Sequence, residues 1–139
     1  MVGMDLSLST CFIIVHDPDE ALGFYRDALG LELRNDVKTE AGRWVTLSSP
    51  TQPQIEIILT DPGAGRPADA DAILALVTKG SLHGVLFRTD DLDATFEKVR
   101  ASGAEVLQEP ADQFWGVRDC AFRDPSGNMI RISQAPTKG

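Results

Sequence analysis

Few side chains in this sequence are of the types that carry out nucleophilic or metal-dependent chemistry. It contains two histidines, His16 and His83, and two cysteines, Cys11 and Cys120. A nucleophilic cysteine needs a base within hydrogen-bond reach, and no histidine stands beside either cysteine. The glycine-rich stretch 63–67 lacks the rest of a phosphate-binding loop, and no G-x-S-x-G motif occurs. We therefore expect two reduced, partly buried thiols and neither a serine hydrolase nor a nucleotide-binding loop.

Two tryptophans are better candidates for holding a ligand. Trp44 and Trp115 are the only ones, and their indole faces offer stacking area and attraction for cations. Arg43 and Arg118 lie close to them in the sequence. For the tryptophans the alternative is a place in the core or in an interface. For the arginines it is a salt bridge shared by equivalent strands.

These residues belong to two halves of the chain that repeat each other. Residues 17–30 and 91–103 each read as a helix, with Asp17 or Asp91 as N-cap and Gly30 or Gly103 as a left-handed C-cap. The two N-caps are 74 residues apart. Strand-like segments flank both helices at offsets of 73 to 75, so each half reads strand, helix, strand, strand, strand. The paired segments are 12–15 with 85–89, 31–33 with 104–106, 43–50 with 118–125, and 54–59 with 129–134.

The repeat predicts one structural domain built from two modules. We assign residues 1–60 to the first βαβββ module and residues 83–139 to the second. The stretch between them, 61–82, is rich in proline, glycine and alanine at its start and runs into a short amphipathic helix over 68–79. We interpret it as a connector that could close over a groove.

The charge balance excludes some partners. Thirteen basic and twenty-one acidic residues give a net charge of −8, with no basic run for nucleic acid or for an anionic membrane surface. The longest apolar stretch, 72–77, is far shorter than a membrane span. The N-terminal residues do not resemble a signal peptide, so we expect a cytoplasmic protein. The acidity favours a cationic or zwitterionic small molecule over an anionic one.

Two motifs resemble those of a known superfamily. Residues 17–31 read D-P-D-E-A-L-G-F-Y-R-D-A-L-G-L, and residues 124–130 read D-P-S-G-N-M-I. Together with the tandem repeat they resemble the vicinal oxygen chelate superfamily of glyoxalases, bleomycin resistance proteins and extradiol dioxygenases, over about residues 8–134. The resemblance implies an α+β fold in which two modules form a cupped mixed sheet around a cavity, usually in a homodimer.

The resemblance also implies where a divalent metal ion would bind. Metal-dependent members use a histidine or glutamine early in the first strand of each module and a glutamate in the last strand. Counted from the helix caps, these positions are Thr10, Gly84, Glu56 and Arg131, of which only Glu56 is a metal ligand. His83 is one residue from the expected position, and a β-bulge would be needed to bring it to the same face. We therefore predict no cofactor and expect Glu56 to pair with Arg131.

The segment W-G-V-R-D at 115–119 is similar to bleomycin-resistance and related antibiotic-binding members. Metal-free members of this kind hold a ligand in a groove at the dimer interface and sequester it without chemistry. This is our first hypothesis. A metal-dependent lyase, isomerase or dioxygenase that uses Glu56 with His83 is the second, and a domain acting only through protein contacts is the third. The candidate ligand-binding residues are Trp115, Trp44, Glu56, Arg131, Arg118 and His83.

Overall fold

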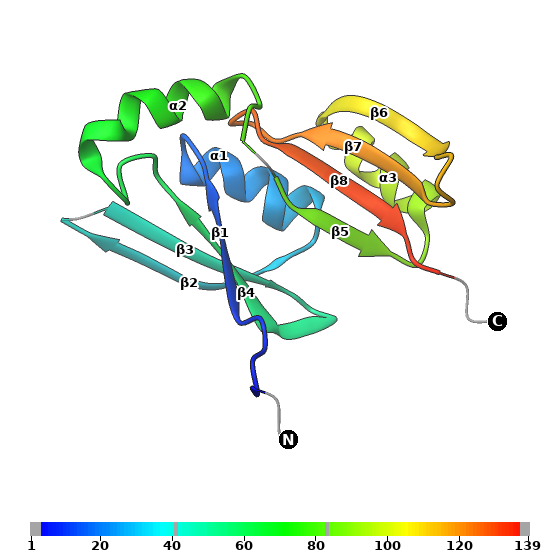
Figure 1. The fold of residues 1–139 in the computed structure, drawn as a ribbon, viewed down its shortest axis with the longest axis horizontal. Helices are drawn as coiled ribbons and strands as arrows, with labels where there is room; N and C mark the ends of the chain where they lie inside the picture. The colour runs from blue at the N-terminus through cyan, green and yellow to red at the C-terminus, as the bar shows by residue number, and fades with distance from the viewer. Residues whose placement is uncertain (1–3, 41, 83, 137–139) are drawn as a thin grey trace.

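The computed structural model describes residues 4–40, 42–82 and 84–136. It contains two four-stranded mixed sheets that lie beside each other (Figure 1). His83, one of the candidate ligand-binding residues, lies outside the described residues. The elements of the first half are β1 (Thr10–Ile14), α1 (Pro18–Leu22) with its π-helical continuation η1 (Gly23–Ala28), β2 (Glu32–Thr39), β3 (Gly42–Ser49) and β4 (Gln52–Thr60). Those that follow are η2 (Pro67–Asp69), α2 (Ala70–Thr78), β5 (Leu86–Thr89), α3 (Leu92–Ala101), β6 (Glu105–Asp112), β7 (Arg118–Arg123) and β8 (Met129–Gln134).

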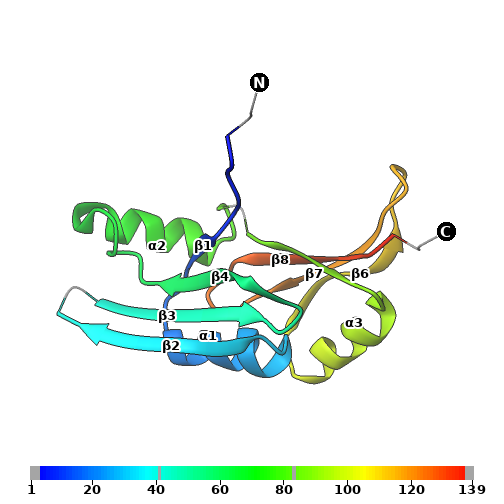
Figure 2. The ribbon, with the colours of Figure 1, turned by 90° about the horizontal axis from the view of Figure 1, so that it is seen from below.

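The two sheets have the same topology, which confirms the predicted repeat and the α+β class. The strand orders are β1-β4-β3-β2 and β5-β8-β7-β6. In each sheet the first strand runs parallel to the last, and the other pairs are antiparallel. In Figure 2, α1 and α3 lie together on one side of the sheets and α2 lies on the other. The module boundaries at 60/61 and 82/83 remain a prediction.

The helices begin and end where the local sequence predicts. The Asp17 carboxylate accepts a hydrogen bond from the backbone N–H of Asp19 at 2.9 Å, and that of Asp91 accepts one from Ala94 at 3.1 Å. Pro18 occupies the first helical turn, where its missing N–H costs nothing. Gly30 and Gly103 follow the helices with φ of 80° and 94°, a conformation that only glycine adopts readily. The connector helix, expected over 68–79, is observed as Ala70–Thr78 after a 3₁₀ turn.

The two modules share one hydrophobic core. Apolar side chains from the inner faces of both sheets pack against α1, η1 and α3 in a single cluster. Its largest fully buried members include Tyr25, Leu47, Leu59 and Phe122. Buried side chains of both modules therefore contribute to the same cluster. No helix in the described part of the chain has the length and apolar character needed to cross a bilayer.

One turn of the second module forms several hydrogen bonds with the first module. Asp124 Oδ1 accepts hydrogen bonds from the backbone N–H groups of Ser126, Gly127 and Asn128, each at 2.9 Å. Its other oxygen, Oδ2, accepts the hydroxyl of Tyr25 at 2.6 Å and the side-chain amide of Asn128 at 3.0 Å. The buried Asp124 carboxylate therefore joins the turn formed by the D-P-S-G-N motif to the first helix.

Two more contacts cross between the modules at this turn. The side-chain amide of Asn128 donates to the carbonyl of Ile14 at 2.8 Å, and the backbone N–H of His16 donates to Ser126 Oγ at 2.9 Å. His16 is exposed, and its Nε2 lies 2.9 Å from Thr78 Oγ1 at the end of α2. The turn therefore contacts the first module directly and, through His16, is linked to the connector helix.

Candidate functional site

The positions at which the resemblance implies a metal ion bring few donor atoms together in the described part of the chain. Thr10 and Glu56 are direct neighbours on β1 and β4. On the second sheet the matching neighbours are Leu86 and Arg131. The strand ladder therefore equates Thr10 with Leu86, and the sequence-based equivalence with Gly84 is wrong by two residues. The reason is that Leu86 precedes its helix cap Asp91 by five residues, whereas Thr10 precedes Asp17 by seven.

Neither position in the second module offers a donor atom. Leu86 carries an apolar side chain, and a Cβ on Gly84 would collide with the carbonyl oxygen of Met129. Among the described residues, no group of three or more His, Cys, Asp and Glu side chains could hold a metal ion. Glu56 is exposed, and it is the sole metal-binding side chain at these positions.

Arg131 pairs with a carboxylate other than the predicted one. Its Nη1 lies 3.1 Å from Asp119 Oδ2, so the expected Glu56–Arg131 pair is wrong. The Asp119 side chain is 4% exposed and also accepts hydrogen bonds from Gln108 at 2.9 Å and Gln113 at 2.8 Å. Burial by itself would raise the pKa of Asp119, but these hydrogen bonds and the charge of Arg131 outweigh it and lower the pKa. Arg131 therefore compensates a buried charge within the second sheet.

Arg118 takes part in an ion-pair pattern that both modules repeat. It lies 2.9 Å from Asp93 in α3 and 3.3 Å from Asp112 at the end of β6. The Arg43 guanidinium lies 3.0 Å from Asp19 in α1 and 2.7 Å from Asp36 in β2. Each arginine thus ties the first turn of a helix to the second strand of its module. This favours the shared salt bridge over a ligand contact for both arginines.

The two tryptophans lie in different surroundings. Trp115 is 58% exposed in the loop between β6 and β7, a hairpin that projects from its sheet (Figure 2). It contacts Phe114 edge-on with ring centroids 4.7 Å apart, and Phe114 is 96% exposed. The Gln113 side chain, bonded to Asp119, anchors the base of this loop. Trp44 is half-buried on β3 and meets Phe12 edge-on at 6.4 Å.

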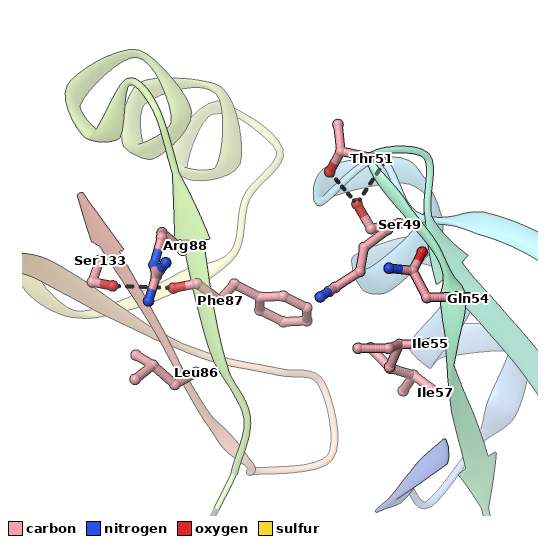
Figure 3. Close-up of a pocket in the computed structure, with 10 residues that line it drawn as sticks. Ser49, Thr51, Gln54, Ile55, Ile57, Leu86, Phe87, Arg88 and Ser133 are labelled. Carbon is pink, nitrogen blue, oxygen red and sulfur yellow. Dashed lines mark hydrogen bonds between the residues drawn. The ribbon is translucent and has the colours of Figure 1, made fainter. Parts of the chain in front are cut away.

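The largest hollow among the described residues lies between the two sheets, and none of the candidate residues that the structure describes lines it. It is a cleft of about 540 Å³ between the β3–β4 turn with β4 on one side and β5 with β8 on the other. Figure 3 shows Phe87 pointing across the cleft toward Ile55 and Ile57, whereas Leu86 points away. The lining residues are Ser49, Thr51, Gln52, Gln54, Ile55, Ile57, Leu86, Phe87, Arg88 and Ser133. Six of the ten lining residues carry hydroxyl, amide or guanidinium groups and four are apolar, and no described residue contributes a carboxylate.

A smaller hollow of about 180 Å³ adjoins the cleft. The two share Ser49, Phe87 and Arg88, and the smaller one continues toward the apolar side chains of Leu31 and Ile132. The cleft and the adjoining hollow together have a volume that suits a small organic molecule. We missed these residues in the sequence because they form no motif. Only the polar residues Arg88 and Ser133 within apolar strands gave a signal.

The expectation of a cationic ligand came from the net charge, and the cleft offers a cation no carboxylate. The described residues around it carry one formal charge, that of Arg88. The cleft therefore carries a positive charge, whereas the chain as a whole has a net charge of −8.

Comparisons with known proteins agree with this fold. A model of the glyoxalase/bleomycin resistance protein/dioxygenase superfamily matches residues 7–132. The crystal structure of UcmS2 is 30% identical with a TM-score of 0.85, covering 95% of this chain and 100% of that one. That of TnmS3, an antibiotic binding protein from Streptomyces sp. CB03234, is 29% identical with a TM-score of 0.76, covering 96% and 100%.

A relative of undescribed role is also similar along most of its length. The uncharacterized protein YurT of Bacillus subtilis is 30% identical over 122 residues, which are 88% of this chain and 94% of YurT. The residues that the family model matches, 7–132, include both capped helices and the D-P-S-G-N turn. The chain belongs to the glyoxalase/bleomycin resistance protein/dioxygenase superfamily.

Proposed function

We propose that the protein binds a small organic molecule in the cleft between its two modules and does so without a metal ion. The observation that carries this proposal is the contrast between two places on the molecule. Of the positions implied for a metal ion, Glu56 offers a carboxylate and Thr10 a hydroxyl group. Leu86 and Arg131, the matching neighbours on the second sheet, cannot coordinate a metal ion. The cleft, in contrast, combines an aromatic and three aliphatic side chains with six residues that carry hydroxyl, amide or guanidinium groups, and such converging polar groups can orient a small molecule.

The binding unit that we propose is a homodimer, with ligand and partner contacts close together. Several apolar side chains are more than half exposed, and a monomer gains nothing from exposing them. They are Met4, Leu6, Leu8, Phe12, Leu86, Phe114 and Trp115. The similarity to TnmS3, whose description is that of an antibiotic binding protein, supports binding without conversion. Free Cys11 and Cys120 are in keeping with a reducing compartment, the cytoplasm.

Elemental analysis separates this function from metal-dependent catalysis. We expect only trace metal in tag-free protein expressed with added zinc, nickel, iron and manganese. About one metal ion per chain would refute metal-free binding and make an enzyme that uses Glu56 the better hypothesis. Glu56→Gln should then lose the metal, which tests that alternative directly.

A cleft-filling variant tests where the ligand binds. Ile55 points into the cleft in Figure 3, so Ile55→Trp should occlude it. The matched control is Ala72→Trp, on an exposed position of α2 outside the cleft. A thermal-shift screen of aromatic compounds should find stabilisers of the wild type and of Ala72→Trp. At 100 times its Kd a ligand stabilises by about 2.7 kcal/mol. Equal shifts in the correctly folded Ile55→Trp variant would place the ligand elsewhere.

Light scattering and fluorescence test the dimer and Trp115. We expect a solution mass of about twice 15.1 kDa. Trp115→Ala should keep the melting temperature, because the side chain is 58% exposed. Trp115 does not line the cleft of its own chain, so a loss of ligand-induced tryptophan quenching in this variant would place Trp115 at the ligand through the partner subunit. A monomer at micromolar concentration, or unchanged quenching in this variant, would remove the partner or Trp115 from the proposal.

A further inference from the structure

Arg88 is the one arginine in the described chain that has no carboxylate partner. The sequence has nine arginines, and eight of them lie within 4.0 Å of an aspartate or glutamate oxygen. Arg88 differs although the chain has twenty-one acidic residues. In a protein this acidic, an unpaired guanidinium on the wall of the largest cleft is free to bind an anion from solution.

The surroundings of Arg88 suit an anion attached to an apolar body. Arg88 lines both the cleft and the adjoining hollow, and Ser133 and Ser49 contribute hydroxyl groups to the cleft. Phe87 projects between the two walls toward Ile55 and Ile57 (Figure 3). No carboxylate among the described residues lines the cleft to repel a negative charge. The cleft therefore offers one positive charge, hydrogen-bond donors and an aromatic face together.

The charge count limits the anion to a single negative charge. A guanidinium binds a carboxylate through two parallel N–H···O bonds and compensates one charge. A phosphate dianion would keep an uncompensated charge inside a protein of net charge −8. We infer that the cleft binds a monoanionic carboxylate with an apolar, ring-sized body, and that Arg88 holds the carboxylate. This inference rests on the proposed small-molecule function and specifies the chemistry of its ligand.

Two ring-matched probes test the role of charge. We would titrate 2-naphthoate and the neutral 2-naphthamide into full-length protein and follow the methyl NMR signals of isoleucine. Ile55 and Ile57 report occupancy of the cleft directly. We expect 2-naphthoate to bind at least threefold more tightly than 2-naphthamide, and this preference to shrink as sodium chloride increases. The size is modest because Arg88 is exposed and screened by water.

Charge-matched variants assign the preference to Arg88. Arg88→Gln should abolish the preference for 2-naphthoate with little change for 2-naphthamide. Arg88→Lys should keep part of it, because a lysine retains the charge but not the two-bond geometry. Arg100→Gln removes the same charge from an exposed pair on α3 and should keep the full preference.

The outcomes distinguish this inference from the proposed function. Equal binding of both probes at Ile55 and Ile57, unaffected by Arg88→Gln, would overturn the carboxylate inference and leave small-molecule binding in place. Tighter binding of 2-naphthyl phosphate than of 2-naphthoate would overturn the assignment to a single charge. If neither probe shifts these methyl signals at millimolar concentration while another compound from the thermal-shift screen does, the inference fails and the function stands. If no compound does, both fail.

Discussion

The hydroxyl of Tyr25 allows a sharp test of how the two modules are joined. Tyr25 is the only tyrosine, its side chain is fully buried, and it donates a 2.6 Å hydrogen bond to Asp124 Oδ2. Burial raises the pKa of Tyr25 well above 10, and the charge and hydrogen bond of Asp124 raise it further. Folding therefore favours the protonated phenol, which makes stability depend on alkaline pH.

The expected size follows from these contacts. At pH 7, Tyr25→Phe loses a hydrogen bond to a charged group, but Asp124 keeps four other donors and is not left unpaired. We expect a loss of about 1–2 kcal/mol, or about 3–8 °C in melting temperature. Above pH 10 the unfolded tyrosine ionises and the folded one does not, so the wild type loses about 1.4 kcal/mol more per pH unit than the variant. The two stability curves should meet roughly one pH unit above 10.

Absorbance at 295 nm and circular dichroism provide the assay. In the folded wild type the tyrosinate signal should be absent at pH 10 to 11 and should appear together with unfolding. Other titrating groups are common to both proteins and cancel in the difference between their stability curves. Ionisation of Tyr25 with a pKa near 10 while the protein remains folded would refute the reasoning. So would stability curves that stay parallel above pH 10.

Three further predictions concern backbone, thiols and ion pairs. Gly127→Ala should lower the free energy of unfolding in urea by about 2–4 kcal/mol, because φ is 117° and a Cβ would lie 2.6 Å from the Thr78 carbonyl oxygen. Gly23→Ala, where a Cβ would meet open space, should be neutral or slightly stabilising. Equal effects of the two substitutions would contradict the packing described. Burial raises the pKa of Cys120 to about 11. In Cys11→Ser, Cys120 is the remaining thiol, and it should resist Ellman's reagent at pH 8 until urea unfolds the protein. Rapid reaction of the folded variant would contradict the burial of Cys120. Arg43→Gln and Arg118→Gln should each lower the free energy of unfolding in urea by less than about 1 kcal/mol, because their aspartate partners lie at the surface. A loss above about 2 kcal/mol would show that these ion pairs stabilise the positions of the helices.

The parts of the fold that the sequence predicts well are those governed by neighbouring residues. The caps at Asp17 and Asp91 and the left-handed Gly30 and Gly103 depend on a few positions each, so their spacing revealed the repeat. The turn at Asp124 was recognised for the same reason. Its contact with Tyr25 was not, because 99 residues separate the two in the chain.

The predictions about the site failed where they relied on equivalence between the repeats. Pairing Glu56 with Arg131 assumed that matching positions face each other. Instead Asp119 on the adjacent strand lies within reach of Arg131, as diagonal neighbours on one sheet face do. The cleft was not predictable in this way, because Arg88 and Ile55 come together only through the packing of one module on the other.

The Asp124 turn also bears on how the chain folds as the ribosome makes it. The strands of the first module can pair once residue 60 has emerged, but Tyr25 must then wait for a carboxylate 99 residues further on. Asp124 lies 64 residues beyond residue 60, so at synthesis rates of about 5–20 residues per second that wait is about 3–13 s. During it, the nascent chain exposes the apolar surface that the second module will cover. A chaperone that recognises exposed apolar surface can bind the nascent chain during this interval. The interval ends when residues 124–128 emerge and the turn can form its hydrogen bonds with the first module.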